Sequence, residues 1–81
     1  MKEVNFKYEK NGKQTERKVL VIEEKDDFIA GIDYTHLTND KANSLRAMAK
    51  SKTDEFDPKN YMDAFRRFNR SKVSNLKEEI L

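Results

Sequence analysis

Residues 4–13, VNFKYEKNGK, carry the clearest structural signal in the chain. Val4, Phe6 and Tyr8 alternate with polar residues, which is the period-2 pattern of a half-buried β-strand. Asn11-Gly12 follows directly, and both residue types tolerate the positive φ angles of a type I′ turn. The stretch therefore predicts a strand that turns back on itself in a β-hairpin.

The hydrophobic pattern continues this hairpin into a third strand. The return strand reaches VLVI at residues 19–22, an unbroken apolar run typical of a central strand that is covered on both faces. A polar turn, EEKDD at 23–27, separates it from FIAGIDY at 28–34, where alternate residues again differ in character. Gly31 inside this segment indicates a bulge or a close backbone approach. Residues 1–34 are therefore predicted to form a three-stranded antiparallel meander.

After the meander the hydrophobic period changes to that of a helix. Asn39 or Asp40 can cap a helix over residues 39–51. The alanines of this segment give it good helix propensity, and one face is apolar. The apolar stripe consists of Leu45, Met48 and Ala49.

A second helix is predicted over residues 57–69. Asp57-Pro58 has the form of a helix start, with Asp as the cap and Pro at the first helical position. The three-residue spacing of Phe65 and Phe68 favours a helix, because both rings would then reach the core. In a strand, the two rings would face opposite sides unless a bulge lay between them. Residues 70–76 are a possible closing strand, and helix and strand both remain open for the segment from Phe65 onward.

The order of these motifs resembles the small SH3-like β-barrels of the WYL-type ligand-binding domains and related short phage proteins. In that family a first strand and hairpin lead into a basic strand, and an aromatic strand then ends in glycine-x-aspartate. A closing segment follows, of the form Arg-x-Phe-x-x-x-Arg/Lys-Ile/Val. Phe28 takes the place of the aromatic that opens the family's name motif, and Arg66, Phe68, Lys72 and Val73 fall on the closing pattern. The counterparts here are VNFKYEKNGK, ERKVLVIEE, DFIAGID and RRFNRSKVSNL.

The resemblance covers about half of the chain. Phe28-Ile29-Ala30 replaces the Trp-Tyr-Leu triplet, Asn69 stands where the family usually has a second arginine, and residues 35–64 are inserted before the closing segment. Pattern and resemblance together predict an α+β fold, a small SH3-like antiparallel sheet or barrel with one or two helices inserted before its last strand. The resemblance also implies that the chain passes from helix into strand near Phe68. It further implies that basic residues on the barrel bind nucleic acid or a nucleotide-like effector.

Composition limits the class of protein. The chain has 81 residues and no cysteine, which fits one small domain without a disulfide or a thiolate metal site. No apolar run approaches the ~20 residues needed to cross a bilayer. The segment MKEVNFKYEK lacks the hydrophobic region of a signal peptide. We therefore expect a cytoplasmic protein, in the host cytoplasm if it is viral, with no membrane association and no cofactor.

The residues needed for catalysis or metal binding are scarce. His36 is the only histidine, and no cysteine is present to act as a nucleophile. A serine or threonine nucleophile would need His36 as its base and a third group, Asp33 or Asp40, to orient the ring. One histidine and scattered carboxylates lack the spacing of a metal site, and two glycines cannot form a phosphate-cradling loop. We expect a protein that is not an enzyme, with His36 in a turn or on the surface.

The leading candidate site is a cluster of basic residues in the segment AFRRFNRSKV, at 64–73. Arginine presents a planar fork that pairs with two oxygens of a phosphate or carboxylate and stacks on bases. Stacking platforms on the sheet could come from Tyr8, Phe28 or Tyr34, although a core this small needs most of its rings. The predicted anion-binding residues are Arg66, Arg67, Arg70 and Lys72, with Lys18, Arg46 and Lys50 as weaker additions.

Two classes of partner remain open. Charged residues form 40% of the chain but the net charge is only +2, so the placement of the charges matters more than their sum. The basic cluster fits single-stranded nucleic acid or a nucleotide-like ligand. Acidic blocks at 23–27 and 54–57 fit instead a phage or mobile-element accessory protein that binds and inhibits a host protein. In a third interpretation, each charged block is simply solvated.

Overall fold

Five antiparallel strands and one α-helix form the core of the fold in a computed structural model, which describes residues 1–51 and 57–81. Three short 3₁₀ helices connect these elements. The predicted α+β class is therefore observed. The bounds are β1 Lys2–Lys10, β2 Lys13–Glu24, β3 Phe28–Asp33, η1 Tyr34–His36, α1 Asn39–Ser51, η2 Pro58–Ala64, β4 Phe65–Asn69, η3 Arg70–Lys72 and β5 Val73–Ile80.

The sheet has the strand order β4-β3-β2-β1-β5, with every neighbouring pair antiparallel. The first three strands follow one another in the sheet as they do in the sequence, which confirms the predicted meander. The last strand pairs with the first, so β5 reaches the opposite edge from β4. The sheet is open, because β4 and β5 are its two edges and no ladder joins them among the described residues.

The predicted hairpin turn joins β1 to β2. Asn11 has φ 55° and Gly12 has φ 77°, the left-handed pair that a type I′ turn requires. Lys10 and Lys13 are the last cross-strand partners before the turn. Counting back along this register places Phe6 opposite Arg17, so the turn sets which side chains of β2 share a face with β1.

Gly31 is a point of close backbone approach, one of its two predicted roles. A Cβ atom at this position would lie 1.9 Å from the carbonyl oxygen of Leu20 on the neighbouring strand. The ladder between β2 and β3 also shifts register between Val21 and Glu23, so an irregularity lies beside the glycine. Only a residue without a side chain lets the two strands approach this closely.

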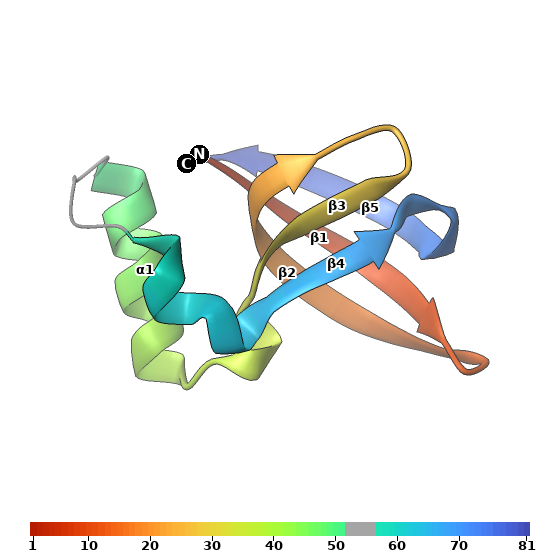
Figure 1. Cartoon of the computed structure of the whole chain (residues 1–81), viewed down its shortest axis with the longest axis horizontal. Helices are drawn as coiled ribbons and strands as arrows, with labels where there is room; N and C mark the ends of the chain where they lie inside the picture. Colours follow the sequence, from red (N-terminus) through yellow and green to blue (C-terminus); the bar gives the residue numbers. More distant parts are fainter. Residues whose placement is uncertain (52–56) are drawn as a thin grey trace.

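Hydrophobic residues form two cores on opposite faces of the sheet. Val19 and Leu20 are adjacent in β2 and both fully buried, one in each core, as expected for a central strand. We call the two the helix-side core and the opposite core. Figure 1 shows α1 and the turquoise segment after it on one side of the sheet. The helix-side core contains Leu20, Ile32, Tyr34, Leu45, Ala49 and Ala64, and the opposite core contains Val4, Phe6, Val19, Ile29 and Phe68.

The sheet curls strongly around the opposite core. Strands β1 and β4 are separated by β2 and β3, and in a flat sheet they would lie about 14 Å apart, three strand spacings. Nevertheless the ring centroids of Phe6 in β1 and Phe68 in β4 are 5.0 Å apart, and those of Tyr8 and Phe68 are also 5.0 Å apart. Curling brings these two strands face to face and creates a concave surface.

Helix α1 spans the predicted residues, Asn39–Ser51, but its cap differs from the prediction. The hydroxyl of Thr38 accepts a hydrogen bond from the Lys41 amide at 3.3 Å, and the Thr38 carbonyl accepts one from Ala42 at 2.9 Å. Thr38 is therefore the N-cap, rather than Asn39 or Asp40, and threonine is one of the residues favoured at this position. Leu45 and Ala49 of the predicted stripe are buried and Met48 is half-buried.

The predicted helix over residues 57–69 is wrong in its second half. Asp57 caps a helical segment and Pro58 occupies its first turn, as predicted, but the segment is a 3₁₀ helix that ends at Ala64. From Phe65 the chain is strand β4, because its backbone completes the ladder on the free edge of β3. Phe65 then packs against the helix-side core, while Phe68 enters the opposite core.

The closing strand predicted over residues 70–76 is observed, but it begins at Val73. Residues 70–72 form the 3₁₀ turn η3, and β5 runs from Val73 to Ile80 along β1. The acidic block at 54–57 lies outside the described residues except for Asp57. No helix in the described ranges is long and apolar enough to span a membrane.

Candidate functional site

A hollow of about 400 Å³ lies on the concave side of the sheet. Its wall carries five lysine or arginine side chains, one histidine and two aromatic rings, and no carboxylate belongs to the lining. We call it the basic hollow. Its lining residues are Tyr8, Lys10, Arg17, His36, Arg66, Arg67, Phe68 and Lys72.

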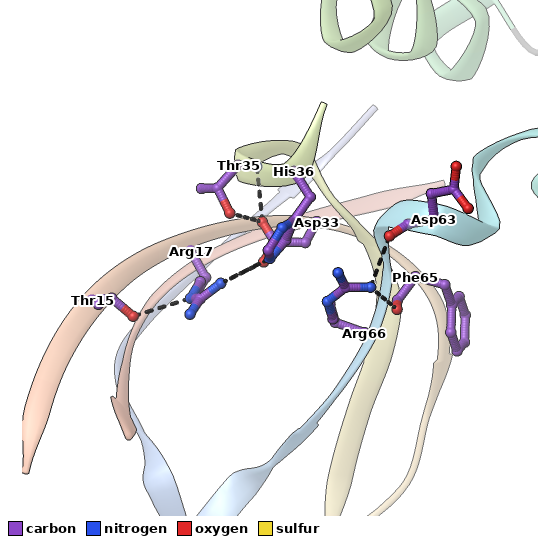
Figure 2. Close-up of polar contacts among 8 residues, drawn as sticks. All are labelled: Thr15, Arg17, Asp33, Thr35, His36, Asp63, Phe65 and Arg66. Carbon is purple, nitrogen blue, oxygen red and sulfur yellow. Dashed lines mark hydrogen bonds and ion pairs between the residues drawn. The ribbon is translucent and has the colours of Figure 1, made fainter. Parts of the chain in front are cut away.

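Arg66 is oriented by the turn that precedes β4. Its Nη1 donates hydrogen bonds to the carbonyl oxygens of Asp63 at 2.9 Å and Phe65 at 2.8 Å, as Figure 2 shows. Both bonds use the same nitrogen of a guanidinium that has five N–H donors. Neutral backbone oxygens thus position the Arg66 side chain without compensating its charge. Its other N–H groups can still donate to an anion.

Arg17 lines the hollow but was not among the anion-binding residues predicted from the sequence. Its Nη1 lies 3.0 Å from Asp33 Oδ2 and 3.4 Å from His36 Nε2, and its Nε donates to Thr15 Oγ1 at 3.1 Å. Figure 2 shows these contacts beside Arg66. The register of the Asn11–Gly12 hairpin was the available signal, since it places Arg17 opposite the inward-facing Phe6.

Asp33 anchors this arrangement from beneath. Its side chain is fully buried, and Oδ1 accepts hydrogen bonds from the Thr35 amide at 2.9 Å and the Thr35 hydroxyl at 2.6 Å. The remaining oxygen, Oδ2, holds Arg17 and lies 3.7 Å from His36 Nε2. The carboxylate therefore fixes one arginine in the hollow while all of its own surface is withdrawn from solvent.

Aromatic rings form the floor of the basic hollow. Phe68 is buried, and Tyr8 is half-buried against it in an edge-on arrangement. The Tyr8 hydroxyl accepts a hydrogen bond from the Asn69 amide at 3.3 Å. The other two predicted stacking platforms are covered, Phe28 by the Arg67 guanidinium at 3.8 Å and Tyr34 by the helix-side core. Tyr8 is the remaining candidate platform.

Three of the four leading candidates, Arg66, Arg67 and Lys72, meet at the basic hollow, whereas Arg70 does not. Its Nη2 lies 3.0 Å from Glu24 Oε2, and its Nε donates to the Lys25 carbonyl at 2.7 Å. This internal ion pair ties η3 to the end of β2. The charge of Arg70 is consequently compensated within the chain.

The three weaker candidates also lie elsewhere. Arg46 on α1 and Lys18 on β2 both pair with Glu3, at 2.9 Å and 3.5 Å, and Glu3 is buried. The Arg46–Glu3 contact fastens the helix to the sheet, and both cations compensate the charge of the buried carboxylate. Lys50 is exposed on α1.

Ion pairs at the end of the sheet shift the pKa values of Glu24 and Lys2. The pKa of Glu24 is lowered below its usual 4.5, mainly by a hydrogen bond from Lys2 and less by the charges of Lys2 and Arg70. The pKa of Lys2 is raised correspondingly, chiefly by hydrogen bonds to Glu24 and Glu78. Burial in the helix-side core raises the pKa of the Tyr34 hydroxyl. All of these groups lie outside the basic hollow.

The hollow offers N–H donors, positive charge and a ring surface, which together suit binding of a phosphate-bearing ligand. No group of three or more potential metal-binding side chains occurs within residues 1–51 and 57–81. His36 lies in the 3₁₀ turn η1 and is exposed, as predicted, and it also lines the hollow. Comparisons of this chain with protein-family models, with curated proteins and with solved structures found no match.

Proposed function

We propose that this protein is a non-enzymatic binding module that takes up single-stranded nucleic acid or a nucleotide-like ligand in the basic hollow. The observation that carries the proposal is the lining itself, in which five cationic side chains and two rings converge, with one carboxylate, Asp33, buried beneath Arg17. Arg66, Arg67 and Lys72 come from β4 and η3, whereas Arg17 and Lys10 come from the first hairpin. Segments far apart in the sequence thus supply one positive surface.

Each part of the lining has a distinct role in this proposal. Arg66 and Arg17 are held by hydrogen bonds, so little side-chain freedom is lost when they contact a phosphate. Tyr8 supplies a ring edge and face for a base or for the planar part of a nucleotide. The volume of about 400 Å³ falls in the usual range of small-molecule sites, which suits one nucleotide unit at a time.

The fold proposed for this module is an open SH3-like barrel. Support comes from the strand order, in which the last strand pairs with the first, and from the curl that brings Phe6 and Phe68 together. The short 3₁₀ turn η3 between β4 and β5 carries the chain from one edge of the sheet to the other. The elements η1, α1 and η2 lie between β3 and β4 in the sequence, and α1 and η2 cover the helix side.

Binding of a labelled single-stranded oligonucleotide, measured by fluorescence anisotropy at several salt concentrations, tests the proposal. The test variant is Arg66→Ala with Lys72→Ala. The matched control, Lys41→Ala with Lys50→Ala, removes the same charge from exposed positions on α1. We expect the test variant to bind at least tenfold more weakly, with a slope of log K against log salt reduced by about 0.7 per lost phosphate contact. The control should bind nearly as tightly as the wild type.

Two outcomes would overturn the proposal. Wild-type protein that binds neither the oligonucleotide nor mononucleotides at low salt would exclude a nucleic-acid or nucleotide ligand and leave a host protein as the partner. Equal weakening in the test and control variants would show that overall charge, and not the basic hollow, determines binding.

A further inference from the structure

Strand β5 presents an open edge. It pairs with β1 on one side only, and all of its residues from Ser74 to Ile80 are exposed. Leu76 is 38% exposed and Ile80 is 77% exposed, which places two of the five exposed large hydrophobic residues of the described ranges on this one strand. Unpaired edges of this length are templates for another strand.

The backbone of β5 leaves hydrogen-bonding groups pointing outward. The Leu81 amide donates to the Met1 carbonyl at 2.8 Å, which makes these two a hydrogen-bonded pair across the ladder. Bonded and non-bonded pairs alternate in antiparallel sheets. The N–H and C=O groups of Ile80 and Glu78 therefore point away from β1. A register shift opposite Asn5 to Lys7 interrupts this alternation near Asn75, whose φ is 54°.

The side chains of β5 are complementary to a second copy in one antiparallel register. When Glu78 faces Glu78 of the other copy, Lys77 faces Glu79 and Leu76 faces Ile80, and each of these pairs occurs twice. Shifting the register by one pairing step in either direction keeps one like-charge pair, Lys77 against Lys77 or Glu79 against Glu79, but loses both Lys77–Glu79 pairs and both Leu76–Ile80 contacts. Opposite charges and apolar pairs stabilise directly opposed positions, and like charges destabilise them.

The central Glu78 pair has its charge partly compensated within each chain. Lys2 Nζ lies 3.1 Å from Glu78 Oε1, so in a symmetric pair of copies each Glu78 carboxylate would have a lysine of its own chain beside it. The other open edge, β4, is unsuited to the same pairing, because Arg66 and Arg67 occupy its middle and a central register would place arginine against arginine. Self-association through β5 also leaves the basic hollow free, since none of its lining residues lies on β5.

We propose that β5 pairs with β5 of a second copy of this chain, antiparallel and centred on Glu78, to join two five-stranded sheets into one. Backbone hydrogen bonds at Glu78 and the two Leu76–Ile80 contacts hold the dimer, and the two Lys77–Glu79 pairs select the register.

Single cysteines test the register directly, because the natural chain contains none. Directly opposed hydrogen-bonded residues have Cα atoms about 5.5 Å apart, within the range of a disulfide, whereas positions offset by two residues are about 7–8 Å apart. We expect Glu78→Cys to form a covalent dimer under mild oxidation several-fold faster than Lys77→Cys or Glu79→Cys. All three positions are exposed, so the variants should fold alike.

Sedimentation equilibrium of the cysteine-free protein gives an independent measurement. We expect a concentration-dependent dimer that Ile80→Lys weakens by about tenfold or more and Glu78→Gln strengthens, since Gln removes the like-charge pair. A wild-type protein that remains monomeric at the concentrations of the cross-linking experiment would overturn the proposal. Cross-linking that is no faster at position 78 than at 77 and 79 would overturn it equally.

Discussion

Arg17 and Asp33 form an ion pair across β2 and β3 in which the carboxylate is fully buried and the guanidinium side chain is 18% exposed, with 3.0 Å between Nη1 and Oδ2. The exposed partner lines the basic hollow, and the buried partner is fixed by Thr35. One interaction thus links the stability of the sheet to the shape of the candidate site.

Asp33→Asn should destabilise the protein and loosen Arg17. The amide keeps the size of the side chain but removes the charge that Arg17 pairs with, and one of its hydrogen bonds becomes a donor–donor contact. We expect the free energy of unfolding to fall by about 1–3 kcal/mol, measured by urea denaturation. Thr15→Ala, which removes only an exposed hydrogen bond to Arg17, is the control and should change stability by less than about 0.5 kcal/mol. An unchanged midpoint for Asp33→Asn would contradict the anchoring role.

Arg46→Ala should affect stability and leave ligand binding unchanged. The substitution leaves the buried Glu3 carboxylate with Lys18 alone, at 3.5 Å, so we expect a loss of about 1–3 kcal/mol in urea denaturation. Adding Glu3→Gln to Arg46→Ala should recover part of that loss, because the unpaired charge is then absent. Lys50→Ala on the same helix serves as the control. Equal destabilisation by both single variants would show that the ion pair with Glu3 is unimportant.

Gly31→Ala should prevent the native sheet from forming. The new Cβ would meet the Leu20 carbonyl at 1.9 Å, and a backbone atom in the middle of a ladder cannot move aside cheaply. We expect loss of the cooperative thermal transition, followed by circular dichroism. Gly12→Ala is the matched comparison. Open space surrounds the new Cβ, so only the positive φ of 77° disfavours alanine there, and we expect the free energy of unfolding to fall by about 1–2 kcal/mol. A Gly31→Ala protein as stable as Gly12→Ala would be inconsistent with the close approach.

The Lys2–Glu24 ion pair should give a stability difference that disappears in acid. The pKa of Glu24 is lowered in the folded protein, so its contribution is present above pH 4.5 and is lost as the pH falls through the folded-state value. We expect Glu24→Gln to be less stable than the wild type at neutral pH by under about 1 kcal/mol, as is usual for exposed pairs. Denaturation curves at several pH values should show the two proteins converging below pH 4.5. A difference that persists in acid, or that salt does not reduce, would point to another cause.

Much of the fold can be predicted from the sequence because its signals are local. The alternation before Asn11–Gly12 and the helix propensity of residues 39–51 both depend on neighbours within a few positions. The segment after Ala64 could not be assigned in this way. Phe65 and Phe68 have helical spacing, yet the free edge of β3 and the presence of two cores allow each ring to pack against a core from a strand. A tertiary pairing overrides local spacing there.

The candidate site was only partly predictable for a related reason. Arg66, Arg67 and Lys72 are close in the sequence, and their cluster is visible as a pattern. Arg17 joins them only because the sheet curls, and curling is not a local property. Arg70 belongs to the same sequence cluster but pairs with Glu24, forty-six residues away, and no spacing rule indicates such an ion pair.

The segment between β3 and β4 leaves the sheet and returns to it at neighbouring points, since Ile32 and Phe65 are cross-strand partners. Topologically, β3 and β4 form a single antiparallel hairpin, and the described elements of its connection, α1 and η2, cover one face of the sheet. Such a connection can lengthen, shorten or be exchanged over evolution without changing the pairing of any strand, provided that Leu20 and Ile32 stay shielded from water. The concave face, to which this connection contributes His36, is built mostly by other residues and is then free to diverge largely on its own.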